Sequence, residues 1–162
     1  MGPVSHTEIH PSAMKVVTFL AEAGHPHEVV MLPVTGRTAA DAAAALGVEL
    51  GQIAKSIVFR RKSDDAAVLV VTSGDLRVDE KKVAAIVGAL GRADADFVKS
   101  ATGFSIGGVS PVAHTTPPVM LIDAELFRFD EIWAAAGHPH AVFPLSPAEL
   151  VELTGAETAD VT

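Results

Sequence analysis

The sequence predicts a mixed α/β domain, with helices around a mixed or antiparallel sheet. Helix and strand patterns alternate along the chain, but the crossovers are too irregular for a doubly wound parallel sheet. The strand patterns at 53–60 and 68–72 flank a polar turn and indicate an antiparallel hairpin. The apolar residues are mostly small or β-branched, with 27 Ala and 21 Val, which suits Ala-rich helices packed on Val-rich strands.

Length and composition limit the class of protein. A chain of 162 residues that is 49% hydrophobic can form one core, and we expect a flexible leader at 1–10, the domain at 11–154 and a frayed tail at 155–162. The absence of Cys excludes disulfide and zinc–thiolate frameworks. Because no apolar run reaches the roughly 18 residues of a membrane span and no secretory signal is seen, we expect no membrane partner and a cytoplasmic location.

The first half of the domain is expected to contain a helix, a strand, a second helix and the first strand of the hairpin. Apolar spacing predicts a helix over 12–23, and an apolar run predicts a strand over 29–32. Thr38 has the position of an N-cap for an Ala-rich helix that ends before Gly47. From Ile53 the apolar period changes to two, which is typical of a strand.

The second half adds helices, strands and one long loop. Ser146 and Glu149 form a capping box before a last helix that runs to about residue 153. Residues 102–111 show neither period and contain three Gly, which indicates a loop. The other predicted elements are helices over 79–90, 94–101 and 130–136 and strands over 119–122 and 141–143.

Lys55 is the first residue that points to chemistry. In the predicted strand it shares a side with Ile57 and Phe59, where burial disfavours the charge of a lysine that has no partner. There the ammonium would lose basicity or serve as a fixed cation for an anionic ligand. Alternatively, Lys55 precedes the buried part of the strand and its ammonium reaches solvent.

The loop at 102–111 is the second such feature. Gly107 and Gly108 allow unusual backbone torsions, and Pro111 fixes the far end. Successive N–H groups of such a loop can turn towards one carbonyl or phosphate oxygen. Its apolar residues indicate that it packs inside the domain, and an ordinary surface turn is the alternative.

Other motifs carry weaker signals. No Gly-x-Ser-x-Gly motif is present, and Ser110 with His114 lacks a third orienting group, so a protein nucleophile is not expected. No glycine-rich nucleotide signature follows a strand, which argues against a nucleotide cofactor. Ala-Gly-His-Pro-His occurs at 23–27 and 136–140 without nearby carboxylates, so we interpret both copies as helix-to-strand boundaries rather than metal sites.

Lys55 and this loop, in this order, resemble the YbaK/prolyl-tRNA synthetase-associated editing domain family. The resemblance covers roughly residues 11–154 and implies a largely antiparallel, barrel-like mixed α/β fold. It also implies a free-standing hydrolase that deacylates mischarged aminoacyl-tRNA without metal or cofactor. The motifs that carry it are Gln52-Ile53-Ala54-Lys55-Ser56-Ile57-Val58-Phe59, Asp79-Glu80-Lys81-Lys82-Val83-Ala84, and Thr102-Gly103-Phe104 through Gly107-Gly108-Val109-Ser110-Pro111.

The resemblance implies a set of site residues. Lys55 matches the family's essential lysine, and Gly107 and Pro111 match its Gly-x-x-x-Pro loop, whose backbone helps to hold the aminoacyl group. Because the ester is already activated, a positioned water and a stabilised oxyanion suffice, with help from the neighbouring 2′-hydroxyl. Lys55 would anchor a phosphate or the terminal ribose, or orient the water. The expected substrate-binding residues are Thr102, Gly103, Phe104, Gly107, Gly108, Val109, Ser110, Pro111, Leu32 and Gly137.

Two departures from the better-known cysteinyl-tRNA(Pro) deacylases bear on the substrate. Leu32 stands where we align an aromatic residue of those proteins, and Ala135-Ala136-Gly137 stands where they have Ser-Gly-Gly. A pocket separates amino acids that differ by one methylene by only about 1–3 kcal/mol. Cysteine, alanine, serine and threonine esters therefore all stay open, with tRNA(Pro) as the expected carrier.

The charge of the chain restricts how it could bind RNA. A formal net charge of −8 argues against broad nucleic-acid binding, and no DNA partner is expected. The resemblance implies the acceptor end of an aminoacyl-tRNA as partner, with prolyl-tRNA synthetase as a further one. Salt-sensitive contacts would be local, although the basic hairpin tip can equally be a solvated turn. The candidate RNA contacts are Arg60, Arg61, Lys62, Lys81, Lys82 and Lys99.

Two other functions stay open beside the hydrolase. The same fold could hold a tRNA end or a synthetase surface without catalysis, or it could hydrolyse small amino-acid esters without RNA. Deacylation of a panel of mischarged tRNAs distinguishes the first from an enzyme. Comparison of free esters with charged tRNA tests the second.

Overall fold

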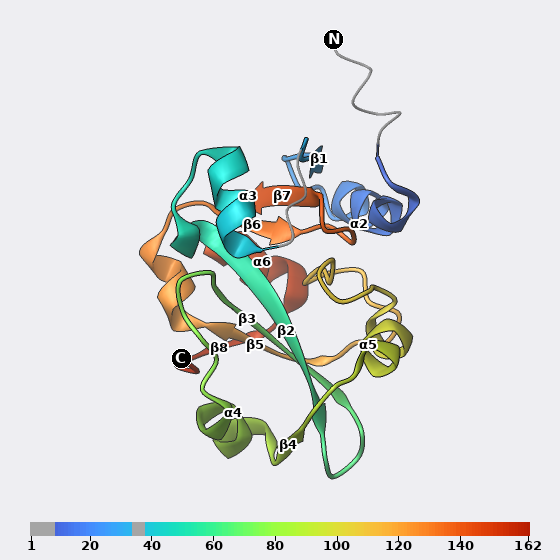
Figure 1. Ribbon diagram of the computed structural model, residues 1–162, viewed down its shortest axis with the longest axis vertical. Helices are drawn as coiled ribbons and strands as arrows, with labels where there is room; N and C mark the ends of the chain where they lie inside the picture. The colour runs from blue at the N-terminus through green and yellow to red at the C-terminus, as the bar shows by residue number, and fades with distance from the viewer. Residues whose placement is uncertain (1–8, 34–37) are drawn as a thin grey trace.

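The computed structural model describes residues 9–33 and 38–162, and within them a mixed sheet forms the centre of the molecule (Figure 1). The strand order is β1-β7-β6-β2-β3-β5-β8, and β4 pairs with the outer part of β2. Both antiparallel pairs, such as β6–β7, and parallel pairs, such as β3–β5, occur. The strands are β1 (Val30–Met31), β2 (Ile53–Arg61), β3 (Ala67–Ser73), β4 (Leu90–Gly91), β5 (Val119–Asp123), β6 (Ile132–Ala135), β7 (Ala141–Leu145) and β8 (Glu157–Ala159).

The hairpin of β2 and β3 runs diagonally through the molecule in Figure 1. Its register pairs Lys55 with Thr72 and Phe59 with Val68, so these side chains share one face of the ribbon. The predicted hairpin is confirmed, and so is the prediction of a mixed sheet with helices around it.

Helices surround this sheet, and their ends follow the capping residues in the sequence. Thr38 accepts a hydrogen bond from the Asp41 N–H at 3.0 Å, and Ser146 and Glu149 form the predicted capping box. None of the helices in the described ranges is long and apolar enough to cross a membrane. The helices are α2 (Pro11–Glu22), α3 (Ala39–Leu46), α4 (Glu80–Val87), α5 (Ala95–Thr102) and α6 (Pro147–Thr154), with 3-10 turns η1 (Leu50–Gln52) and η2 (Ala124–Arg128).

Strand β3 is buried on both faces because apolar clusters cover each side of it. Leu69 and Val71 belong to the main core, whereas Val68 and Val70 pack in a smaller cluster with Val83 of α4. A third cluster lies under α3 and includes Ala42, Ile53 and Val142, which α3, β2 and β7 contribute. This third cluster fixes α3 beside the first residues of β2.

The prediction of a helix over 130–136 is wrong, because residues 132–135 form strand β6. Its residues alternate in burial, with Ile132 and Ala134 fully buried. β6 is hydrogen-bonded to β7 on one side and to β2 on the other. Pairing on both edges therefore overrides the helix propensity of its alanines.

The end of helix α4 and the last residues of the chain also differ from the predictions. Helix α4 stops at Val87 because Gly88 takes a positive φ of 105°, and the next residues form β4. The tail expected to fray at 155–162 forms β8 instead, with Val161 fully buried. Of the leader expected at 1–10, only Ile9 and His10 lie within the described residues, and His10 is the N-cap of α2.

Candidate active site

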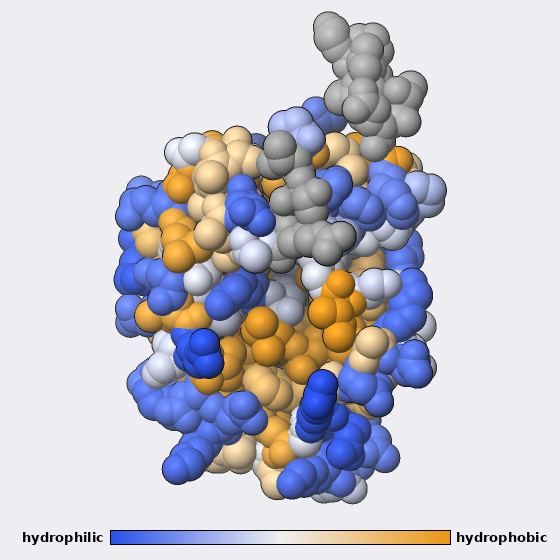
Figure 2. Space-filling model, viewed as in Figure 1, coloured by the Kyte–Doolittle hydropathy of each residue, from blue (hydrophilic) through white to orange (hydrophobic). Residues whose placement is uncertain are grey.

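A cavity of about 250 Å³ opens between β2, α3, β6, β7 and the loop that follows α5. Among the described residues that line it, Lys55 is the one ionisable side chain, and most of the others are aliphatic. The middle of the face shown in Figure 2 is likewise apolar and is surrounded by hydrophilic side chains. The lining residues are Thr38, Ala39, Ala42, Ile53, Ala54, Lys55, Ser56, Ile57, Ile106, Gly107, Val109, Trp133, Ala135, Pro139 and Val142.

Lys55 is half-buried in the cavity wall near the start of β2. Its Nζ donates a hydrogen bond to the Leu76 carbonyl, 3.0 Å away, in the connection between β3 and α4. Burial lowers the pKa of the Lys55 ammonium, the Arg77 guanidinium lowers this pKa further, and the Asp75 carboxylate opposes both effects. The side chain is thus a cation held at a fixed point beside an apolar space.

The loop after α5 reaches the same cavity through Gly107 and Val109. Gly107 has a φ of 95°, which favours glycine, whereas Gly108 is required for another reason. A Cβ at Gly108 would lie 2.9 Å from the backbone N and Cα of His138. The Gly108 N–H donates to the Ser105 carbonyl at 3.0 Å, but those of Gly107 and Val109 have no acceptor in the described part of the chain.

The end of this loop turns away from the Lys55 cavity. Ser110 is fully buried, its Oγ accepts from the Val112 N–H, and its carbonyl accepts from His114 Nε2 at 2.6 Å. Pro111 lines a different cavity, of about 410 Å³, together with His114. Burial lowers the pKa of His114, which keeps this imidazole neutral and suits it to donate to the carbonyl.

Three of the predicted substrate-binding residues do not line the cavity and instead make contacts that support the fold. Thr102 is buried at the end of α5 and its hydroxyl donates to the Val98 carbonyl at 2.7 Å. Gly103 ends α5 with a φ of 85°, and Phe104 lies in the main core with the Lys15 ammonium 4.5 Å above its ring. These residues anchor the start of the loop.

Leu32 and Gly137 lie close to the cavity without lining it. Leu32 belongs to the apolar cluster under α3, beside cavity residues Ala42 and Val142, and its N–H donates to the His140 carbonyl. Gly137 has a φ of 92°, and a Cβ there would lie 2.9 Å from the Phe104 ring. Both residues therefore shape the segment that the loop packs against.

The basic residues of the hairpin tip are mostly neutralised by neighbouring acids. Arg60 pairs with Asp65 at 2.7 Å, and Arg61 with Asp64 at 2.8 Å. The Arg61 hydrogen bond lowers the pKa of Asp64 to about 2. Lys62 has no acidic partner among the described residues. Of the three cations at the hairpin tip, it is the one that forms no ion pair with them.

The remaining candidate RNA contacts lie on helices. Lys82 on α4 pairs with Asp160 at 3.1 Å, whereas Lys81 has no acidic partner in the described ranges. The Lys99 ammonium donates to the Gly103 carbonyl at 3.3 Å. Of these three, Lys82 alone is paired with an acid within the described residues, so Lys81 and Lys99 carry charges that no acidic side chain balances there.

The two Ala-Gly-His-Pro-His copies differ in context. The first follows α2 and leads into β1, as predicted, whereas the second connects two strands, β6 and β7. His138 of the second copy stacks near His10, with ring centroids 4.2 Å apart. In the described residues no three His, Asp or Glu side chains are grouped so that they could hold a metal ion.

Sequence reasoning missed several residues around Lys55. The apolar wall from α3, Trp133 and Pro139 comes together only in three dimensions. The turn that holds Lys55, with Asp75 and Arg77, has no motif of its own in the sequence. A lysine on an apolar strand indicates that its ammonium needs an acceptor, but it does not identify that acceptor.

The comparisons with known proteins agree on one protein family. A family model of the aminoacyl-tRNA editing domain matches residues 33–153. The uncharacterised protein YwhH of Bacillus subtilis (strain 168) is 32% identical over 144 residues, which cover 88% of this chain and 91% of YwhH.

Two solved structures are similar over nearly the whole chain. A crystal structure of a proposed trans-editing enzyme for prolyl tRNA synthetase is 43% identical, with a TM-score of 0.90, and covers 96% of this chain and 99% of its own. The crystal structure of the hypothetical protein APE2540 is 33% identical, with a TM-score of 0.82, and the alignment covers 91% of this chain and 98% of that one.

Proposed function

The chain belongs to the aminoacyl-tRNA editing domain family, and we propose that it is a trans-editing hydrolase that deacylates mischarged aminoacyl-tRNA. The observation that carries this proposal is the shared cavity of Lys55, Gly107 and Val109. An ester carbonyl inside it can approach a cation together with the Gly107 and Val109 N–H groups, which have no acceptor among the described residues. This combination stabilises the negative charge that develops on the carbonyl oxygen during hydrolysis.

The reaction needs no protein nucleophile. A water molecule attacks the ester carbonyl, the bond between the acyl carbon and the ribose oxygen breaks, and a proton passes to that oxygen. The products are the free amino acid and a tRNA with its terminal hydroxyl restored. We assign the Gly107 and Val109 N–H groups as donors to the developing oxyanion, in place of Gly108, whose N–H is bound to Ser105.

Lys55 has two roles open to it, and kinetics separate them. An ammonium that anchors a phosphate or the terminal ribose contributes to binding, so its loss raises KM. An ammonium that orients the water acts in the transition state, so its loss lowers kcat. The fixed hydrogen bond to the Leu76 carbonyl favours the second role, because it holds the ammonium at one point in the wall.

The expected substrate is tRNA(Pro) carrying a small amino acid. A cavity of about 250 Å³ walled by Ala39, Ala42, Ala135 and Val142 suits the side chains of alanine or cysteine better than a large one. The similarity to the proposed prolyl trans-editing enzyme supports tRNA(Pro) as the carrier and prolyl-tRNA synthetase as a partner.

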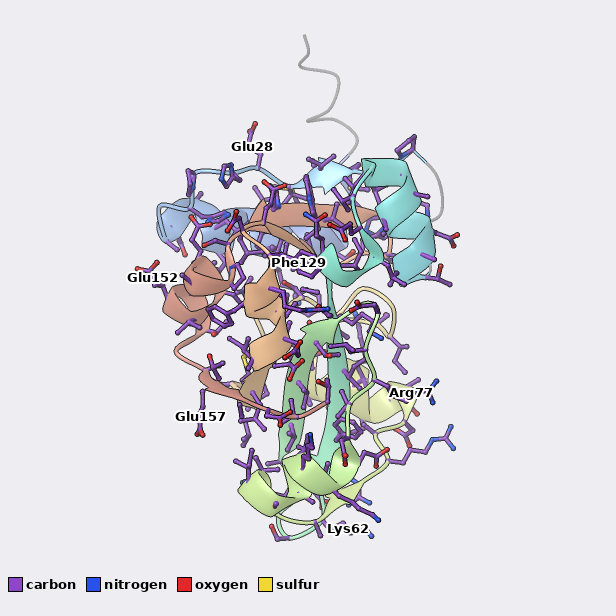
Figure 3. The ribbon with its side chains drawn as sticks, turned by 90° about the vertical axis from the view of Figure 1, so that its left-hand side faces the viewer. Glu28, Lys62, Arg77, Phe129, Glu152 and Glu157 are labelled. Atoms are coloured by element: carbon purple, nitrogen blue, oxygen red, sulfur yellow. The ribbon has the colours of Figure 1, made fainter. Side chains whose placement is uncertain are left out.

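We propose that the acceptor end approaches over the face that carries Arg77. Arg77 extends outward from the body in Figure 3 and is exposed beside Lys55. Arg77, Lys62 and Lys81 lack acidic partners among the described residues. Three such contacts to single-stranded RNA predict that log K falls with log salt with a slope of about −2. Binding that does not weaken with added salt would contradict this.

The decisive experiment is a deacylation assay on tRNA(Pro) charged with alanine, cysteine, serine, threonine or proline. We expect hydrolysis of at least one mischarged ester and little of prolyl-tRNA. Lys55→Ala should lower the rate about 10²- to 10³-fold while the protein stays folded. Lys15→Ala is the matched control, because Lys15 Nζ also donates to a backbone carbonyl, that of Gly103 at 3.1 Å, but outside the cavity.

Four outcomes count against the proposal. Binding of charged tRNA without hydrolysis would support a binding module, and equal turnover of free amino-acid esters would support a small-molecule hydrolase. Full activity of Lys55→Ala would show that Lys55 does not take part in the reaction. A strong loss in Lys15→Ala would mean that lysine removal harms the domain in general.

A further inference from the structure

Lys55 depends on a neighbouring turn for its position. Residues 74–77 connect β3 to the segment before α4, and the Leu76 carbonyl accepts the hydrogen bond of the Lys55 ammonium. A lysine side chain has several rotatable bonds, so this acceptor decides where along the cavity wall the charge is held. Whatever fixes the turn therefore fixes the ammonium.

Arg128, the last residue of η2, binds this turn through Asp75. Its Nη2 donates to Asp75 Oδ1 at 3.0 Å and its Nη1 to Asp75 Oδ2 at 3.3 Å, which is a two-point contact. The same Nη2 donates to Ser73 Oγ at 3.0 Å, and Ser73 Oγ in turn donates to the Gly51 carbonyl at 2.7 Å. The turn is thus linked to β3, η1 and η2 at once.

Close packing leaves this turn little room to shift. A Cβ at Gly74 would lie 3.1 Å from Ala39 Cβ on α3 and would overlap the Leu50 carbonyl oxygen. Phe129, which is partly buried against the main core, lies next to Arg128, whose guanidinium carbon is 4.9 Å from the centre of the Phe129 ring. A turn confined in this way can transmit the position of Arg128 to Lys55.

We propose that Asp75 and Arg128 are positioning residues for Lys55, holding the 74–77 turn so that the Leu76 carbonyl fixes the ammonium at the cavity. The inference rests on the proposed deacylase function, since it assigns a task to residues that touch no substrate. It extends that function by naming what sets the geometry and the charge of the central lysine.

The charges on this turn act on Lys55 in opposite directions. Asp75 and Arg77 flank Leu76, and the carboxylate raises the pKa of Lys55 while the guanidinium lowers it. The other elements around Lys55 present apolar groups to the cavity, such as Ala39 of α3, Trp133 of β6 and Val109 of the loop. The turn is therefore the source of charge tuning among the described residues.

A purely structural role explains this ion pair poorly. The side chains of Asp75 and Arg128 are 36% and 37% exposed, and pairs that exposed contribute about 0–1 kcal/mol to stability. Removing the pair should therefore leave the fold intact. Its effect on the lysine can then be measured in a folded protein.

The first test measures the titration of Lys55 by competitive acetylation and peptide mass spectrometry, without any tRNA. Asp75→Asn should move the titration midpoint of Lys55 to lower pH, and Arg77→Gln should move it to higher pH. Asp65→Asn is the matched control, because Asp65 is also paired with an arginine, Arg60 at 2.7 Å, but at the hairpin tip. The control should leave the midpoint unchanged.

The second test measures kcat and KM with the mischarged tRNA that the wild type hydrolyses. Arg128→Met should lower kcat about tenfold to a hundredfold with little change in KM, since a shift of about 1 Å in a reacting group can cost that much. Arg128→Lys should recover part of kcat, because an ammonium can still reach Asp75. The unfolding midpoint of each variant should stay close to that of the wild type.

The two tests separate this inference from the proposed function. An inactive wild type, or an active Lys55→Ala variant, overturns the function and leaves the titration result to decide the inference. Midpoints that do not move in opposite directions for Asp75→Asn and Arg77→Gln overturn the charge tuning. A kcat of Arg128→Met equal to that of the wild type overturns the positioning.

Discussion

Replacing Gly108 by alanine tests whether deacylation requires the loop after α5 to pack closely against the backbone of His138. A Cβ at this position would lie 2.9 Å from the His138 backbone, whereas ordinary contact begins at 3.4 Å, so the two segments must separate by about 0.5 Å (3.4 − 2.9). Neither partner is a flexible side chain that could move aside. Overpacking of this kind costs about 1–3 kcal/mol of unfolding free energy.

The same displacement moves Gly107 and Val109, which flank Gly108, relative to Lys55. Because an error of about 1 Å can cost a hundredfold in rate, we expect Gly108→Ala to lower kcat about tenfold. The assay is deacylation of mischarged tRNA together with urea unfolding. Gly155→Ala is the control for activity: its φ of 67° makes alanine costly for stability, but no atom lies within 4 Å of the new Cβ and the loop is not displaced, so kcat should stay unchanged. Wild-type kcat and stability in Gly108→Ala would refute the reasoning.

Three further predictions concern buried polar groups. Burial lowers the pKa of His114 below 6.5, so the unfolded chain binds more protons than the folded one just below that pH. The free energy of unfolding, measured with urea, should therefore fall as the pH drops from about 6.5. This fall should be smaller in His114→Gln. Asp123 is buried and accepts from the Val161 N–H and the Thr162 hydroxyl, so Asp123→Ala should cost about 1–3 kcal/mol and expose β8 to protease. Burial also lowers the pKa of Lys55, so Lys55→Met should raise the melting temperature at neutral pH even though it lowers activity. The gain should become smaller as the pH approaches 10.5.

The local signals in the sequence predicted most of the secondary structure correctly. Thr38, Asp79, Asp94 and Ser146 each cap a helix in the structure, because their side-chain oxygens accept N–H groups from the first turn. The hairpin of β2 and β3 followed from period-two alternation and a polar turn. These features depend on residues close together in the chain.

The errors arose where distant pairing decides the structure. Residues 130–136 are rich in alanine and favour a helix locally, but β2 and β7 on either side hold 132–135 as a strand. The tail after 155 has no strong local pattern, yet its pairing with β5 and the buried Asp123 hold it in place. The β2 partner of β6 and the β5 partner of β8 lie far away in the sequence, so no local window contains both partners of these two pairings.

In the candidate site, too, local sequence patterns identify some features and only the tertiary structure shows the others. Lys55 and the glycine loop stand out in the sequence because a lysine on an apolar strand and three glycines in an apolar loop are costly without a purpose. Gly108 was singled out for its freedom of conformation, but the structure requires it for a close approach to His138. Arg128 and Asp75 stand 53 residues apart, and nothing local connects them to Lys55.

The sequence by itself determined which residue types are available for chemistry: one lysine on an apolar strand, flexible loop amides, and no thiol. Tertiary structure alone decided that they meet. Chain folding brings β2 and the loop at 107–109 to one cavity and places the turn at 74–77 where its Leu76 carbonyl binds Lys55, and burial there lowers the pKa of Lys55. The physical reason is that desolvation and hydrogen-bond geometry act through space, whereas sequence patterns report only on neighbours along the chain.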